Sequence, residues 1–174
     1  MNRRIAKFEK VSYEQWMSDM EANGLNICAE ESDFRKAYDQ IELPTRATKG
    51  SGGYDFKAPF GFVLPVGDSI VIPTGIRCKI DEDWELLCLP KSGLGFKYRV
   101  QLDNTIGLID SDYYYSDNEG HIMAKITNDG HESKVLSIER GKGFMQGTFV
   151  MYGITEDDDA QGIRNGGFGS TDKR

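Results

Sequence analysis

The segment 162–171, near the C-terminus, combines the residue types that a nucleotide requires. Glycines let backbone N–H groups approach phosphate oxygens closely, an arginine can fork onto phosphate, an aromatic ring can stack on a nucleobase, and hydroxyl groups can donate hydrogen bonds. The residues that suit these tasks are Arg164, Phe168, Gly169, Ser170 and Thr171. Taken alone, the segment is more typical of a disordered chain end.

A second pattern that suits phosphate lies at residues 89–95. A cation, Lys91, and a hydroxyl, Ser92, are followed by Gly93 and Gly95, directly after an expected strand. Such a loop can hold a phosphate, but the GxxxxGK[ST] spacing of a Walker A loop is absent. A plain β-turn explains these glycines equally well.

A carboxylate suited to hydrolysis follows the apolar residues 106–109. The end of a strand holds a side chain in a fixed position, so Asp110 could orient a water molecule and deprotonate it as a general base. Judged singly, however, Asp110 and Asp112 are more typical of turn residues that hydrogen-bond to nearby backbone.

The elements that must position these residues begin near residue 43, where the pattern changes. Before it, residues 1–42 are helical in pattern. Ser12 and Gln15 form a capping-box signature for a helix that ends at Asn23-Gly24, and a second short helix is predicted over 32–38, with Ser32 as its cap.

After residue 43 the sequence is typical of an all-β fold without helices. Short runs of β-branched and aromatic residues are separated by Gly, Pro and Asp turns, as in a sandwich or barrel. An acidic loop is expected at 156–159, before the Gly-rich tail. The predicted strands are 63–64, 69–72, 74–80, 85–89, 106–109, 122–126 and 147–152.

Composition excludes several classes of protein. The chain has 174 residues, enough for one domain, and its net charge of −7 argues against non-specific binding of nucleic acid. Three cysteines without CxxC spacing and two histidines predict neither a structural zinc site nor a disulfide framework. No run is apolar enough to cross a membrane, and the N-terminus shows no secretory signal, so a cytoplasmic protein is expected.

Taken together and in order, five segments resemble the motifs of the trimeric dUTPase family. The resemblance covers about residues 43–171 and implies a mainly β, jelly-roll-like barrel, spanning 43–160. A helical N-terminal extension, 1–42, would precede it, and a Gly-rich lid, 161–174, would follow it. The matching segments are 53–58, 90–95, 107–113, 141–146 and 164–171.

The resemblance implies hydrolysis of dUTP to dUMP and pyrophosphate. Asp110 would deprotonate the attacking water, and Tyr113 would sit against the deoxyribose, where a ribose 2′-hydroxyl could not fit. The hairpin from Asn104 to Gly107 would read the edge of uracil and leave too little room for the methyl group of thymine.

The same resemblance assigns the remaining residues to the triphosphate, which would chelate Mg²⁺. Asp55 would act on the water shell of the metal and would not be a direct ligand. Phe168 would stack on uracil as the lid closes, and the sites would form at the interfaces of a homotrimer. The phosphate-binding residues would be Lys91, Ser92, Gly93, Gln146, Arg164, Gly169, Ser170 and Thr171.

The chain departs from the family pattern at several positions. Lys91 stands where motif two has Arg, which keeps the charge but loses the planar bidentate fork, so weaker positioning is expected. Lys142-Gly143 replaces Asp-Arg in motif four, and Asp172 replaces Gly after Thr171. The segment 114–120 is longer than the usual turn of the family.

Two alternatives remain open beside dUTP hydrolysis. Relatives that share this fold deaminate dCTP with a catalytic glutamate, but Lys125 stands at that position, and a lysine cannot shuttle protons in that way at neutral pH. The other alternative is a regulatory module whose docking surface, for an unknown protein partner, is the N-terminal helices or the segment 114–119.

Overall fold

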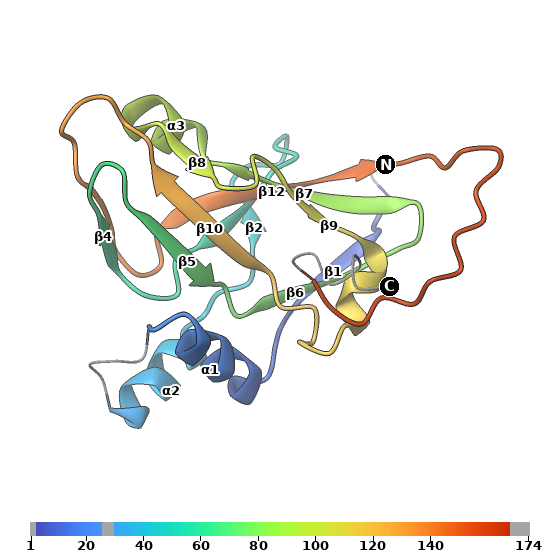
Figure 1. Cartoon of the computed structure of the whole chain (residues 1–174), viewed down its shortest axis with the longest axis horizontal. Coiled ribbons are helices and arrows are strands. Elements are labelled where there is room, and N and C mark those ends of the chain that lie inside the picture. Colours follow the sequence, from blue (N-terminus) through green and yellow to red (C-terminus); the bar gives the residue numbers. More distant parts are fainter. Residues whose placement is uncertain (1–2, 26–29, 168–174) are drawn as a thin grey trace.

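The structure, a computed structural model, describes residues 3–25 and 30–167 and is built mainly from β-strands (Figure 1). No helix in these two ranges is long and apolar enough to cross a membrane. In chain order the elements are β1 (Ala6–Lys10), α1 (Tyr13–Ala22), α2 (Glu31–Asp39), β2 (Thr45–Arg46), β3 (Tyr54–Lys57), β4 (Phe62–Leu64), β5 (Ser69–Pro73), β6 (Ile76–Ile80), β7 (Trp84–Pro90), α3 (Ser92–Tyr98), β8 (Val100–Leu102), β9 (Gly107–Ile109), the 3₁₀ helix η1 (Ser111–Tyr115), β10 (Met123–Asn128), β11 (Leu136–Ile138) and β12 (Gly143–Met151).

The strands form four antiparallel sheets in the described part of the chain. The largest has the order β2-β3-β12-β7-β9, the second has the order β5-β10-β8, and β11-β4 and β1-β6 are two-stranded. The predicted mainly β class is therefore confirmed. The hydrogen-bonded ladders remain four separate sheets and do not close into one continuous barrel.

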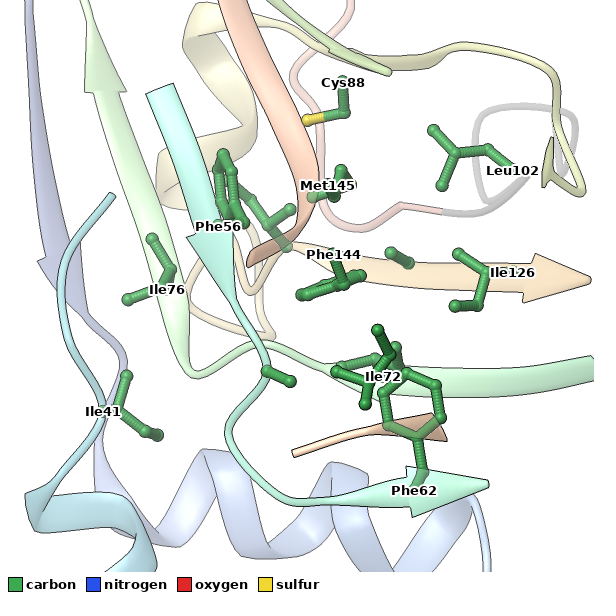
Figure 2. Packing of buried hydrophobic residues seen from close by; sticks show 14 of the residues in the cluster. Ile41, Phe56, Phe62, Ile72, Ile76, Cys88, Leu102, Ile126, Phe144 and Met145 are labelled. Atoms are coloured by element: carbon green, nitrogen blue, oxygen red, sulfur yellow. The ribbon is translucent and has the colours of Figure 1, made fainter. Parts of the chain in front are cut away.

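The core lies between these sheets and gathers side chains that alternate along the strands (Figure 2). In β7, Leu86 and Cys88 are buried, and in β10, Ala124 and Ile126 are buried. Phe144, at the start of β12, is fully buried. Because each fully buried Leu, Ile or Phe side chain contributes about 1.5–3 kcal/mol, this core holds the strands that carry the site in a fixed register.

Helix α1 begins as the sequence predicts. The Ser12 side chain accepts a hydrogen bond from the backbone N–H of Gln15 at 3.1 Å. Trp16 and Met20 are buried, and the indole N–H of Trp16 donates to the carbonyl oxygen of Pro73, at the end of β5. The helix is thereby fixed to the β-structure, below β5 in Figure 1.

Two predictions about secondary structure are wrong. Residues 6–10, expected to belong to a helical extension, form β1, because β6 supplies an antiparallel ladder for them. Residues 92–98, expected to contain no helix, form α3. Gly93 and Gly95 lower the intrinsic helix propensity there, but the carbonyl oxygen of Lys91 accepts from the N–H groups of residues 94 and 95 and starts the turn.

Smaller differences concern element boundaries and short strands. Helix α2 begins at Glu31 after Glu30, so Ser32 lies inside the helix and is not its cap. The strands β2, β3, β8 and β11 were not predicted, because each is only two to four residues long and carries little periodicity.

Candidate active site

Asp110 lies where β9 ends and η1 begins. Its backbone is extended, and its carbonyl oxygen accepts from the N–H of Tyr113 at 3.2 Å, which starts the 3₁₀ turn. Its side chain is about one-third exposed. The carboxylate therefore stands at the rim of the large sheet, open to solvent but fixed at its backbone.

The guanidinium group of Arg164 covers this carboxylate. It forms an ion pair with Oδ2 of Asp110, and its Nε lies 2.9 Å from Oδ1 of Asp112. Its central carbon also lies 5.8 Å from the centroid of the Tyr113 ring. We call Asp110, Asp112, Tyr113 and Arg164 the Asp110 cluster.

The C-terminal segment up to Gly167 folds back onto η1, as the red segment in Figure 1 shows. The carbonyl oxygen of Asn165 accepts from the N–H of Asp117 at 3.3 Å. A Cβ atom at Gly167 would lie 2.8 Å from Cε2 of Tyr113, closer than real Cβ contacts allow. Only glycine permits this close approach to the ring.

Tyr113 is held on both sides of its hydroxyl group. The side chain is buried, and its O–H donates to the carbonyl oxygen of His121 at 2.8 Å and accepts from Nδ2 of Asn118 at 2.8 Å. Burial raises the pKa of Tyr113 and outweighs the lowering effect of the Asn118 hydrogen bond. The hydroxyl group therefore stays neutral and acts through its position.

A cavity of about 230 Å³ opens beside Tyr113. It is smaller than the roughly 300–1,000 Å³ typical of drug-sized sites, which suits a single small ring. The β8–β9 turn forms one wall, and Thr105 has a positive φ of 68° there. The lining residues include Asn104, Ile106, Gly107, Tyr113, Ile122 and Arg164.

A second group of polar side chains gathers on β3, β12 and the end of β7. Gln146 lies opposite Asp55 in the ladder, and its Nε2 donates to Oδ1 of Asp55 at 2.8 Å. The Lys91 ammonium lies 2.9 Å from the same oxygen, and the absence of a side chain at Gly143 leaves room for it. We call Asp55, Lys91 and Gln146 the Asp55 cluster.

Opposing effects act on the pKa of Asp55. Burial raises it, but the hydrogen bond from Gln146 and the Lys91 ammonium together lower it more, so the pKa of the carboxyl lies below its usual value. The Asp55 cluster thus holds a carboxylate and a cation side by side at neutral pH.

The two clusters lie near opposite ends of β7. Leu86 pairs with Ile109, the residue before Asp110, whereas Leu89 pairs with Gln146, and Lys91 follows the last residue of the strand. Five residues of strand at about 3.3 Å each separate Leu86 from Lys91, so the clusters are about 15–20 Å apart along the sheet. One chain therefore does not bring the two clusters together.

The donor set fits Mg²⁺ only in an indirect way. Among residues 3–25 and 30–167, no group of three or more His, Cys, Asp and Glu side chains could enclose a metal. Mg²⁺ usually keeps several waters and takes one or two carboxylates together with substrate phosphates. Both polar contacts of the Asp55 carboxylate use Oδ1, which leaves Oδ2 for a metal-bound water.

The sequence-predicted residues thus divide into two groups and a remainder. Asn104, Gly107, Tyr113 and Arg164 come together around the cavity, and the ion pair with Arg164 joins Asp110 to this group. Asp55, Lys91 and Gln146 come together at the far end of β7. Ser92 and Gly93 are exposed on the first turn of α3, directly after Lys91. Phe168, Gly169, Ser170 and Thr171 lie outside the described residues.

Sequence reasoning missed the contacts of three residues. Asp112 was interpreted only as a turn residue, although it shares Arg164 with Asp110. Asn118 and His121 hold the Tyr113 hydroxyl from the segment that follows it. The proximity of these residues to Tyr113 in the sequence was the one available signal.

Comparisons with known proteins place the chain beside one family. A family model described as dUTPase matches residues 39–171. The deoxyuridine 5′-triphosphate nucleotidohydrolase of Shigella sonnei (strain Ss046) is 37% identical over 143 residues, which cover 78% of this chain and 90% of that protein.

Solved structures give the same result for the fold. The dUTPase from Streptococcus mutans has a TM-score of 0.62 and 25% identity, and the match covers 86% of this chain and 98% of that one. A dUTPase variant from phage phi11 of S. aureus, whose structure reveals how a structural Mg(II) ion is coordinated, has a TM-score of 0.56 at 19% identity. That match covers 71% of this chain and 92% of the phage protein.

Proposed function

The chain belongs to the dUTPase family, and from this premise we propose that it hydrolyses dUTP to dUMP and pyrophosphate. One observation carries the proposal furthest. Asp110 stands at a strand end, and Arg164, its ion-pair partner, lines a small cavity together with Tyr113, within the part of the chain that matches the family. This arrangement places a candidate general base next to a pocket for one nucleobase and its sugar.

Selection of the substrate would rest on the size of this cavity. The backbone of the turn 104–107 would offer hydrogen bonds to the edge of uracil, and the narrow space would reject the methyl group of thymine. The buried ring of Tyr113 would pack against the deoxyribose and leave no room for a ribose 2′-hydroxyl.

Hydrolysis would proceed through one water molecule. Asp110 would orient this water and take its proton while the water oxygen attacks the α-phosphorus, and the bond to the bridging oxygen would break to release pyrophosphate. The guanidinium of Arg164 pairs with both Asp110 and Asp112. On binding, its guanidinium would exchange these carboxylates for phosphate oxygens, which frees Asp110 to act on water.

The Asp55 cluster would bind the triphosphate. The Lys91 ammonium and the amide of Gln146 would donate to phosphate oxygens, together with Ser92 and the backbone at Gly93. Mg²⁺ chelated by the triphosphate would neutralise charge that develops on the phosphates. Asp55 would accept hydrogen bonds from the waters of the metal through Oδ2.

The distance between the clusters supports a site shared between copies of the chain. A base that acts on the α-phosphorus and cations that grip the same triphosphate must lie close together, yet β7 holds them about 15–20 Å apart. A second copy would bring its Asp55 cluster to the Asp110 cluster of the first. A closed homotrimer would repeat this contact three times.

The deaminase alternative receives no support from the geometry around Lys125. Its ammonium lies on β10, 2.9 Å from a carboxylate oxygen of Asp103, and is more than half exposed. Lys125 is engaged in a surface ion pair, and its side chain is not the carboxylate that those relatives use for proton transfer. Release of ammonia from dCTP would contradict this conclusion.

Pyrophosphate release from dUTP, dTTP, dCTP and UTP, measured in parallel with Mg²⁺ and then with EDTA, tests the proposal. We expect turnover of dUTP alone, and its loss in EDTA. Equal turnover of dTTP or UTP would contradict the assignment of the cavity, and no turnover of any nucleotide would contradict the proposed function.

A further inference from the structure

The N-terminal segment, residues 3–25, contacts the loop that follows η1 through two polar contacts far apart in the sequence. The first joins the start of α1 to Glu119. The backbone N–H of Ser12 donates to Oε2 of Glu119 at 2.7 Å, and the Ser12 hydroxyl donates to Oε1 at 2.6 Å. Both carboxylate oxygens of Glu119 are therefore engaged at the N-terminus of α1, where a negative charge is also favoured by the helix dipole.

The second contact joins the middle of α1 to His121. Nε2 of His121 accepts from the backbone N–H of Gly75 at 2.8 Å, so the proton of the neutral ring lies on Nδ1, which donates to Oδ2 of Asp19 at 2.5 Å. The His121 ring is fully buried, and Asp19 is 15% exposed. Such a buried pair fixes both the tautomer and the orientation of the imidazole.

Both contacts lead directly to Tyr113. The carbonyl oxygen of His121 accepts from the hydroxyl group of this tyrosine, and Asn118 donates to the same hydroxyl oxygen. Gly120 lies between Asn118 and His121 in the sequence, and a Cβ atom there would lie 2.6 Å from the backbone oxygen of Tyr113. The loop therefore packs directly against the turn that carries the tyrosine ring. The positive φ of Glu119, 58°, is a conformation that costs energy and that its contact with Ser12 stabilises.

The two anchors on α1 lie outside the part of the chain that matches the family. The family match begins at residue 39, whereas Ser12 and Asp19 precede it. The longer segment 114–120 supplies Glu119, the partner of Ser12. The N-terminal segment and the longer loop therefore form one unit, in which each supplies the partner of the other.

We propose that α1 positions Tyr113 for sugar selection, with Asp19 and Glu119 as positioning residues that act through His121 and the loop 116–121. The inference rests on the proposed function, because Tyr113 selects a sugar only if the chain binds a nucleotide. Asp19 touches no substrate in this account. Its role is to hold the His121 carbonyl oxygen, and through it the tyrosine hydroxyl, in one place.

Four variants of the full chain test this role. Asp19→Ala removes the acceptor of the hydrogen bond from Nδ1 of His121, and Asp19→Asn keeps an oxygen that can accept this hydrogen bond. Glu119→Gln weakens the other contact. Glu14→Ala is the matched control, because Glu14 is an exposed acidic residue of α1 whose side chain has no hydrogen bond or ion pair within the described residues.

The measurement is kcat/KM for dUTP and for UTP, together with hydrogen–deuterium exchange of residues 111–122. We expect Asp19→Ala to lower the preference for dUTP over UTP about tenfold, since small displacements of positioning groups have effects of this order, and to speed exchange. Asp19→Asn should retain most of the preference, and Glu14→Ala should match the unaltered chain.

The outcomes separate the two proposals. An unchanged dUTP preference in folded Asp19→Ala would overturn the positioning role, and if that variant does not fold, an unchanged preference in Glu119→Gln would overturn it. If the unaltered chain hydrolyses no dUTP, the proposed function itself fails. In that case hydrogen–deuterium exchange alone tests the role of α1. Equal protection of residues 111–122 in Asp19→Ala and in the unaltered chain would overturn that role.

Discussion

The Asp55 cluster lies on the five-stranded sheet, whereas the Asp110 cluster follows the edge strand of that sheet, and the two are held in different ways. Asp55 and Gln146 face each other across two adjacent strands, so the ladder and their own hydrogen bond set their spacing. Asp110 and Tyr113 follow a three-residue edge strand and depend on η1, on the loop that follows it and on Arg164. The Asp55 cluster, proposed to bind phosphate, is therefore held rigidly by the sheet. The Asp110 cluster, proposed to be catalytic, needs support from segments distant in the sequence.

The largest effect is expected from a substitution in the Asp110 cluster. Asp110→Asn keeps the shape of the side chain but removes the basic oxygen, so kcat for dUTP should fall about 10²–10⁴-fold while nucleotide binding persists. Asp112→Asn is the matched control, because it makes the same change at the other carboxylate of Arg164. Turnover that survives Asp110→Asn would refute the assignment of the general base.

A smaller effect should follow when the C-terminal segment is pushed away from the cavity. In Gly167→Ala the new methyl group would collide with the buried Tyr113 ring, so KM for dUTP should rise about tenfold, since positioning losses have effects of this order. Gly153→Ala provides the comparison, because a Cβ atom there has no described atom within 4 Å. Equal KM values for the two variants would show that the packing of the segment on Tyr113 does not matter.

The rigid cluster should respond less to a change of its cation. Lys91→Arg restores a planar fork that can bind phosphate with two hydrogen bonds, so kcat/KM for dUTP should rise about threefold. Steady-state kinetics in Mg²⁺ test this expectation, and Lys97→Arg, in the last turn of α3 and exposed, is the control. An unchanged kcat/KM would contradict the idea that a planar guanidinium binds the phosphate better than the Lys91 ammonium does.

The contrast between the clusters also explains what the sequence could and could not predict. The strand that carries Asp110, and the cap of α1 at Ser12, depend on residues a few positions apart, so local patterns predicted them. The mainly β class followed in the same way from turn residues and β-branched runs.

Long-range contacts were beyond such reasoning. Ser12 and Glu119 are 107 positions apart, and Asp19 and His121 are 102 positions apart, so no local periodicity joins them. Strand β1 was missed for the same reason, because its five residues gain their ladder only from β6. Helix α3 was missed because Gly93 and Gly95 have low helix propensity, so the sequence pattern gives no sign of the helix.

The regulatory alternative also rested on segments that local patterns left unexplained. The N-terminal segment and the loop 114–119 were its expected docking surfaces. In the structure, Glu119 is bound to Ser12, and the Tyr114 hydroxyl donates to Glu9 of β1 at 2.6 Å. These side chains contact each other within the chain, and a partner for this surface stays a prediction.

The smallest expected effect concerns pH and the Asp55 cluster. Because the pKa of folded Asp55 lies below its usual value, its ionised form stabilises the fold above a pH of about 4, and this contribution is lost as the pH falls through the lowered pKa. Asp55→Asn should therefore lower the free energy of unfolding at about pH 6 more than at about pH 3. Urea unfolding at both pH values measures this difference, and an equal loss at both would contradict the assigned ion pair.

In the proposed site the two clusters work together only across copies of the chain. Two inactive proteins test it directly: Asp110→Asn, and a double variant with Lys91→Ala and Gln146→Ala, unfolded together and refolded as a mixture. We expect pyrophosphate release from dUTP well above the sum of the separate proteins, with about a quarter of the sites restored in an equal mixture. A mixture no more active than its components would contradict a shared site, because each site would then lie within one copy.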